Sequence, residues 1–143
     1  MKEFTPDVLE IDELALDKEW LNQPGLFMFW AEQSTKARLR FDKAKFNFEK
    51  VEAQISADIR KNPKEYELSK VTEAAIAEAV KCSEEVAEAF QKMVKAKYHS
   101  ELLIKAVAAL EQRRKALENL VFLQNQGYYA ETPSKKMKRR NPK

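Results

Sequence analysis

The fold is decided by the stretch Phe41-Asp-Lys-Ala-Lys-Phe-Asn-Phe-Glu-Lys-Val-Glu-Ala-Gln-Ile-Ser-Ala-Asp-Ile59. Within it and just before it, apolar and small residues recur in alternating steps of four and three, as they do along one side of an α-helix. This seam consists of Trp30, Ser34, Ala37, Phe41, Ala44, Phe48, Val51 and Ile55. The spacing predicts a long helix with a coiled-coil-like contact face.

Helix breakers are rare outside this stretch. The 143 residues include two glycines and five prolines, and no segment alternates like a strand, so we expect an all-α protein. Pro24-Gly25 predicts a break between a short helix over residues 12–22, capped by Asp12 and anchored by Trp20 and Leu21, and a long helix over residues 24–61. Asn62-Pro63 ends the long helix, because a residue before proline leaves the α region.

The second half of the chain predicts another long helix. Residues 62–70 read as a connector, Thr72 as the N-cap of a short helix over residues 72–82, and residues 84–126 as a long helix that stops at Gly127. The seam of this last helix is interrupted at Arg114 and consists of Ala89, Met93, Ala96, Ser100, Leu103, Val107, Leu110, Leu117 and Val121. Two long seams joined by a short connection predict a long antiparallel helical hairpin with short extra helices.

Charge and leftover apolar surface suggest how the chain is organised. Residues 1–23 carry two basic and seven acidic side chains, residues 36–50 six and two, and residues 135–143 six and none. We expect one oligomerising, DNA-binding helical domain over residues 1–130 and a disordered basic tail over residues 131–143. Two helices cannot bury all the apolar side chains, which predicts a homo-oligomer.

Several classes of protein are disfavoured. No apolar run of about 18 residues predicts a membrane span. The acidic N-terminus does not resemble a secretory signal, and the single cysteine favours the cytoplasm. His99 reads as a helix-surface or interface histidine and Cys82 as a small buried residue. Catalytic and metal-binding motifs are absent from the sequence, so we expect no enzyme activity, no metal site and no cofactor.

Basic side chains between the seam positions suggest nucleic-acid binding. Lys36, Arg40, Lys43 and Lys50 share one helical stripe, and Arg38 and Lys45 form a second. Such stripes attract phosphates, and an aromatic side chain such as Phe46 can stack on unpaired bases. Two alternatives remain open: a structural or scaffolding coiled coil whose charges only solvate its helices, and a nucleoid-type or RNA-binding protein.

Two short motifs resemble a known family. Trp20-Leu21-Asn22 followed by Lys36-Ala37-Arg38-Leu39 is similar to the UvsY recombination mediators of tailed phages, although Thr35 stands where the family motif has leucine. The segments Pro63-Lys-Glu-Tyr, Val71-Thr-Glu-Ala-Ala-Ile and Ala116-Leu-Glu-Asn-Leu resemble smaller phage proteins grouped with that family, so the resemblance extends over residues 12–130.

The resemblance implies a function. Members of this family form ring-like homo-oligomers that wrap single-stranded DNA and help a RecA-like recombinase to load in place of single-strand-binding protein. Lys36 and Arg38 then become the first candidates for DNA contact, while helix geometry adds Arg40, Lys43 and Lys45. A phage-encoded mediator would act in the cytoplasm of the host bacterium.

Overall fold

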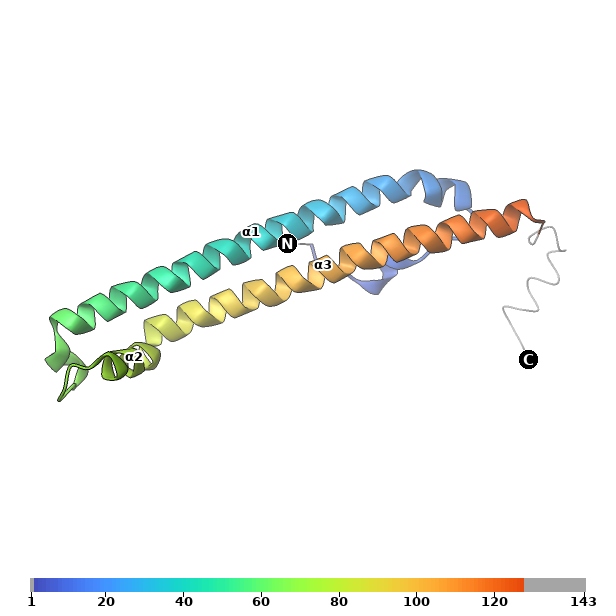
Figure 1. Ribbon diagram of the computed structural model, residues 1–143. Coiled ribbons are helices and arrows are strands. Elements are labelled where there is room, and N and C mark those ends of the chain that lie inside the picture. Colours follow the sequence, from blue (N-terminus) through green and yellow to red (C-terminus); the bar gives the residue numbers. More distant parts are fainter. Residues whose placement is uncertain (1, 128–143) are drawn as a thin grey trace. The chain divides into compact units, whose positions relative to one another are not determined.

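A computed structural model describes residues 2–127, and the fold within them is entirely helical (Figure 1). Its α-helices are α1 (Leu16–Lys61), α2 (Glu73–Cys82) and α3 (Glu84–Asn125), with single 3-10 turns at Pro6–Leu9 and Pro63–Tyr66. The long helices α1 and α3 pack against each other as a hairpin, which confirms the predicted fold class. The predicted basic tail over residues 131–143 lies outside the described residues.

The contacts divide the chain into two compact units. Unit 1 comprises Met1–Ala31 and Lys105–Lys143, and unit 2 comprises Glu32–Ile104. The first part of α1 pairs with the second part of α3 in unit 1, whereas unit 2 contains the remaining parts of both helices together with α2.

Helix α1 is continuous through Pro24, so the predicted break at Pro24-Gly25 is wrong. Proline at this position removes the backbone bond that would reach the carbonyl of Trp20, a loss of roughly 3 kcal/mol in a helix interior. Pro24 and Gly25 are both exposed, so water can reach the freed carbonyl. Buried side chains on each side of the proline, Gln23 and Trp30, fix the two flanking turns within unit 1.

Because α1 is continuous, its buried seam extends back to Leu16, the first residue of the helix. Leu16, Gln23 and Trp30 are buried at intervals of seven, in phase with Ala37. Trp20 and Leu21 fall outside this phase and are 42% and 79% exposed, so the prediction that they anchor the N-terminal segment is wrong.

The start of the first helix was also predicted too early. Helix α1 begins at Leu16, not at residue 12. Asp12 instead closes a local turn, in which its carboxylate accepts a hydrogen bond from the backbone N–H of Leu14 at 2.9 Å. An aspartate side chain commonly competes with helix formation in this way.

Arg113 is the buried polar centre of unit 1. Its guanidinium donates hydrogen bonds to the side-chain oxygen of Gln23, to the carboxylate of Glu19 and, at 2.9 Å, to the backbone carbonyl of Glu10. Gln23 in turn donates to the backbone carbonyl of Leu110 at 3.0 Å. One arginine therefore joins α3 to α1 and to the segment that precedes α1.

This network shifts the seam of α3 from its predicted phase. Leu103, Ala106, Leu110, Arg113 and Leu117 are buried, whereas Val107 and Arg114 are only half-buried. The sequence predicted Arg114 as the polar interruption, but the acceptors on α1 lie where Arg113 can reach them. Two consecutive steps of three, from Ser100 to Ala106, produce the change of phase.

Unit 2 has an apolar core at the turn of the hairpin. Ile55 and Ile59 of α1 pack with Ile76 and Val80 of α2 and with Val86 of α3. Thr72 caps α2 as predicted, because its hydroxyl accepts from the backbone N–H of Ala75 at 3.1 Å. Cys82, at the end of α2, is exposed, so the prediction that it is buried is wrong.

Polar contacts also connect the helices at the hairpin turn of unit 2. Both terminal nitrogens of Arg60 donate to Glu73, at 2.8 and 2.9 Å, which lowers the pKa of the Glu73 carboxyl and raises the pKa of Arg60. The hydroxyl of Tyr66 donates to Asp58 at 2.5 Å, and this hydrogen bond is the main reason why the pKa of Tyr66 rises to about 12.

Replacing Arg113 with alanine is expected to lower the free energy of unfolding by about 3 kcal/mol, because the part-buried carboxylate of Glu19 and the buried amide of Gln23 would lose their partner. Arg114 provides a matched control on the same helix. It pairs with Glu111 and Glu118 at a 39% exposed site, where ion pairs contribute less than about 1 kcal/mol. Urea unfolding followed by circular dichroism measures both variants; equal losses would contradict the importance assigned to Arg113.

The Tyr66–Asp58 bond predicts a loss of stability at high pH. Because folding raises the pKa of Tyr66 to about 12, from an ordinary value near 10, the bond stabilises the fold fully below about pH 10. Its contribution disappears as the pH rises through 12. Urea unfolding at increasing pH should therefore show a smaller loss for Tyr66→Phe than for the native chain. Tyr98→Phe, at an exposed tyrosine, provides the control for loss of a phenol hydroxyl.

Candidate nucleic-acid interface

All five predicted DNA-binding residues lie on α1 within unit 2, and their side chains are exposed. The buried seam of α1 determines this exposure: because Ala37 and Ile55 face the core, the charged residues between the seam positions face solvent. The five residues are Lys36, Arg38, Arg40, Lys43 and Lys45.

The exposed charges of α1 between residues 36 and 50 form two rows along the helix. Successive residues of an α-helix are rotated by roughly 100° about its axis, which places the two rows about 140° apart around α1, one on each side of its outward face. We call the first the basic row, which consists of Lys36, Arg40, Lys43 and Lys50. We call the second the mixed row, which consists of Arg38, Asp42, Lys45 and Glu49. The basic row carries four positive charges, with the carboxylate of Glu32 at its N-terminal end, whereas the charges of the mixed row cancel.

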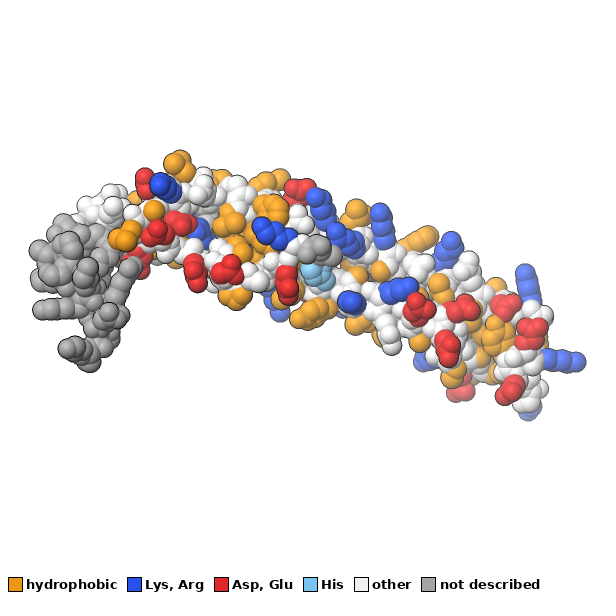
Figure 2. All heavy atoms as spheres, turned by 180° about the vertical axis from the view of Figure 1, so that it is seen from behind, with side chains coloured by type: hydrophobic (Ala, Val, Ile, Leu, Met, Phe, Trp, Pro, Cys, Tyr) orange, Lys and Arg blue, Asp and Glu red, His pale blue; other side chains and the backbone are white. Residues whose placement is uncertain are grey.

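An exposed apolar ridge separates the two rows. It consists of Leu39, which is 54% exposed, and Phe46, which is 69% exposed. Both side chains stand on the face of α1 that points away from the seam. Hydrophobic and basic side chains also lie beside one another on the surface drawn in Figure 2.

Carboxylates on the same helix already contact the two residues that the family resemblance emphasises. Lys36 forms an ion pair with Glu32 at 2.6 Å, and Arg38 forms one with Asp42 at 3.2 Å. The guanidinium of Arg38 also lies 5.9 Å from the centre of the Phe41 ring. Exposed pairs at this spacing are weak, so a phosphate can displace the carboxylate at a modest cost.

Other basic side chains are more available. Within residues 2–127, no ion pair involves Lys43, Lys45 or Lys50. Two of these three, Lys43 and Lys50, belong to the basic row. That row therefore offers unpaired positive charge seven residues apart, or about 10.5 Å along the helix.

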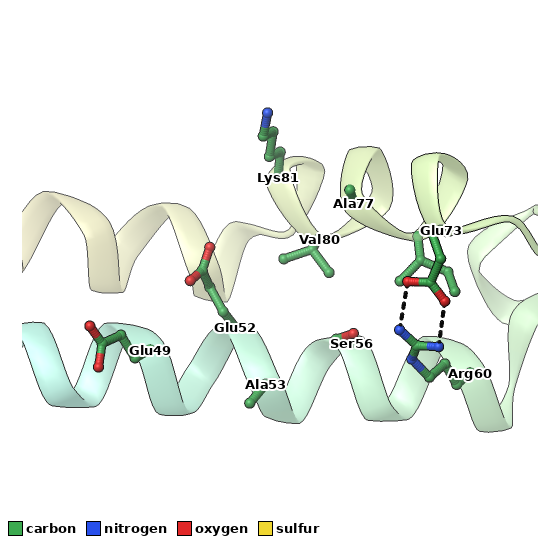
Figure 3. A pocket seen from close by; sticks show the side chains of 10 residues that line it. Glu49, Glu52, Ala53, Ser56, Arg60, Glu73, Ala77, Val80 and Lys81 are labelled. Carbon is green, nitrogen blue, oxygen red and sulfur yellow. Dashed lines mark hydrogen bonds and ion pairs between the residues drawn. The ribbon is translucent and has the colours of Figure 1, made fainter.

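A shallow groove of about 410 Å³ continues the mixed row toward the end of α1. Figure 3 shows Glu52 and Ser56 of α1 facing α2, while the Arg60–Glu73 ion pair bridges the two helices. Glu49 also lines the groove. Glu49 and Glu52 form no ion pair within residues 2–127, and their negative charge disfavours a phosphate on this flank.

A second apolar surface lies on α3 in unit 2. Phe90, Val94, Tyr98 and Leu102 follow one another in steps of four and are between 43% and 66% exposed. We call them the α3 row. Residues spaced by four form a ridge that can pack into the groove of another helix, so this surface is suited to a helical partner.

Sequence reasoning located the exposed cations but missed their internal competitors. Glu32 precedes Lys36 by four residues and Asp42 follows Arg38 by four. Opposite charges at this spacing are neighbours on a helix, so the signal was present in the sequence. The net charge of each row could also be read from the sequence, because residues three, four or seven positions apart lie on the same side of a helix.

Comparisons with known proteins identify no relative: no family model matches the chain, and no curated protein or solved structure matches it. Among the helices of residues 2–127, none is both long and apolar enough to cross a membrane. The geometry of α1 must therefore support any functional proposal by itself, together with the short motifs in the sequence.

Proposed function

We propose that this protein binds single-stranded DNA along α1 and acts as a recombination mediator. The observation that carries the proposal is the basic row beside an exposed apolar ridge on the same helix. Phosphates are attracted to the row by charge, and unpaired bases can stack on Phe46. A duplex keeps its bases stacked on one another, so it gains less from the ridge.

The mediator role rests on the resemblance to the UvsY family. The segment Lys36-Ala37-Arg38-Leu39, which carries that resemblance, contributes one residue to the basic row, one to the mixed row and one to the ridge. As a mediator, the protein would help a RecA-like recombinase to replace single-strand-binding protein on the strand. Its expected location is the host bacterial cytoplasm.

We further propose that the active form is a homo-oligomer, arranged as a ring. The α3 row supports this assembly, because four large apolar side chains in register are costly to leave in water. Repetition of the basic row around a ring would multiply its contacts with one strand. Such multivalency raises affinity without any new type of contact.

A scaffolding coiled coil is the second candidate function. The α3 row favours it equally, since an apolar ridge would serve any helical assembly. The two functions differ in the basic row, which a scaffold does not require. A stable oligomer that does not bind oligonucleotides near physiological salt would identify the scaffold, and tighter binding of RNA or duplex would indicate the nucleoid-type or RNA-binding alternative.

Replacing Lys43 and Lys50 with alanine is expected to weaken binding of an oligothymidine by about tenfold at low salt. The change should also reduce the slope of log affinity against log salt by about 1.4, since each phosphate contact on a single strand contributes about 0.7. The double variant Lys36→Ala, Arg38→Ala should lose less, because carboxylates already engage both side chains. Fluorescence anisotropy at several salt concentrations measures both effects.

A matched control uses two exposed lysines of unit 2 that lie outside the basic row, Lys81 and Lys95. Their double alanine variant removes the same charge and should change affinity by less than about twofold. If it weakens binding as much as the Lys43/Lys50 variant, the site assignment is wrong. The assignment would also be wrong if neither double variant weakened binding.

Placing a glutamate at Val94 or Tyr98 is expected to convert the oligomer to a smaller species, because a charge buried against an apolar partner is strongly unfavourable. Sedimentation equilibrium measures the mass. Val71→Glu supplies the control at an apolar residue that is 56% exposed and outside the α3 row. An unchanged mass for both row variants would exclude this surface as the subunit contact.

A further inference from the structure

We propose that the strand lies across α1 in one orientation, with its phosphates on the basic row and its bases on the apolar ridge, and that Asp42 selects unpaired bases against duplex. This inference rests on the proposed function, since it concerns how the same site holds DNA. It adds a specificity-determining residue whose charge has the opposite sign from the rest of the site.

The two rows of α1 differ in net charge. A phosphate on the basic row meets Lys36, Arg40, Lys43 or Lys50, and two of these make no ion pair within residues 2–127. A phosphate on the mixed row would lie near Asp42 and Glu49 as well as near cations. Like charges in such proximity disfavour binding. The sugar-phosphate backbone is therefore placed on the basic row.

The surfaces that border the basic row determine where the bases lie. From the basic row, a nucleotide can extend across α1 only over the ridge or over the buried seam, and the seam is occupied by packing. On the ridge, Leu39 and Phe46 offer apolar and aromatic surface. Bases gain by stacking there, whereas phosphates gain nothing. At about 3.4 Å per stacked nucleotide, the seven-residue interval of the row spans about three nucleotides.

Asp42 lies beyond the ridge, at the edge of the mixed row. Its side chain is 54% exposed, and Arg38 Nε donates to its Oδ1 at 3.2 Å. The other carboxylate oxygen can accept hydrogen bonds from exocyclic amino groups at base edges. A duplex in the same position would present its second phosphate backbone to this carboxylate. Asp42 therefore tolerates base edges and repels the second strand.

The chain provides a matched control for this residue. Glu32 carries the same charge, is 53% exposed and also pairs with a cation four residues away, but it lies beside Lys36 of the basic row. Removing either carboxylate frees one cation. Only Asp42 lies on the far side of the ridge from the phosphates, so only its removal should alter the discrimination between single strand and duplex.

The experiment compares Asp42→Ala and Glu32→Ala in anisotropy titrations with a mixed-sequence single strand, whose A, C and G bases carry exocyclic amino groups, and with the duplex formed from the same strand. We expect Glu32→Ala to tighten binding of both probes by the same factor. Asp42→Ala should tighten duplex binding about fivefold more than single-strand binding. Asp42→Ser provides a second variant, and circular dichroism confirms that each variant keeps its helicity.

The outcomes separate this inference from the proposed function. If the native chain prefers the single strand and both alanine variants shift the two probes equally, Asp42 has no selective role, and the inference is overturned while the DNA site stands. If the native chain binds neither probe, the proposed function fails and the inference with it. A native preference for duplex would likewise overturn the inference.

Discussion

Burial of one face of α1 is the constraint on which the rest of the structure depends. A helix of 46 residues that contains a proline has little stability of its own, so it persists because one side is packed. Trp30, Ala37 and Ile59 are almost completely buried, and a large buried apolar side chain contributes about 2 kcal/mol. The phase of this face then decides which side chains are presented to solvent.

The exposed chemistry of α1 is a consequence of that phase. Once Ala37 and Ile55 face inward, the basic row, the ridge and the mixed row take fixed positions around the helix, with no loop or pocket required to orient them. A continuous helix also fixes the spacing along its axis. Lysines recur every seven residues along the basic row, so this surface is suited to a ligand with regularly spaced charges, such as a nucleic-acid strand.

Polar interactions give each unit its specificity. In unit 1 the guanidinium of Arg113 donates to acceptors on α1 and on the segment that precedes α1, so a shifted register would leave it buried without partners. In unit 2 the Arg60–Glu73 pair and the Tyr66–Asp58 bond attach α2 and the preceding turn to the end of α1. Apolar contacts alone would tolerate sliding of one helix along the other, whereas these bonds do not.

The sequence by itself determined the helical class, the hairpin, the N-cap at Thr72, the stop at Gly127 and the exposure of Lys36, Arg38, Arg40, Lys43 and Lys45, because these follow from periodicity and local backbone preferences. Tertiary structure decided the rest. Packing on both sides of Pro24 overrode its local tendency to end the helix, and the acceptors on α1 selected Arg113 over Arg114 for burial. Local sequence rules describe the cost of a proline or a buried charge, but only the partners that surround it show how that cost is offset.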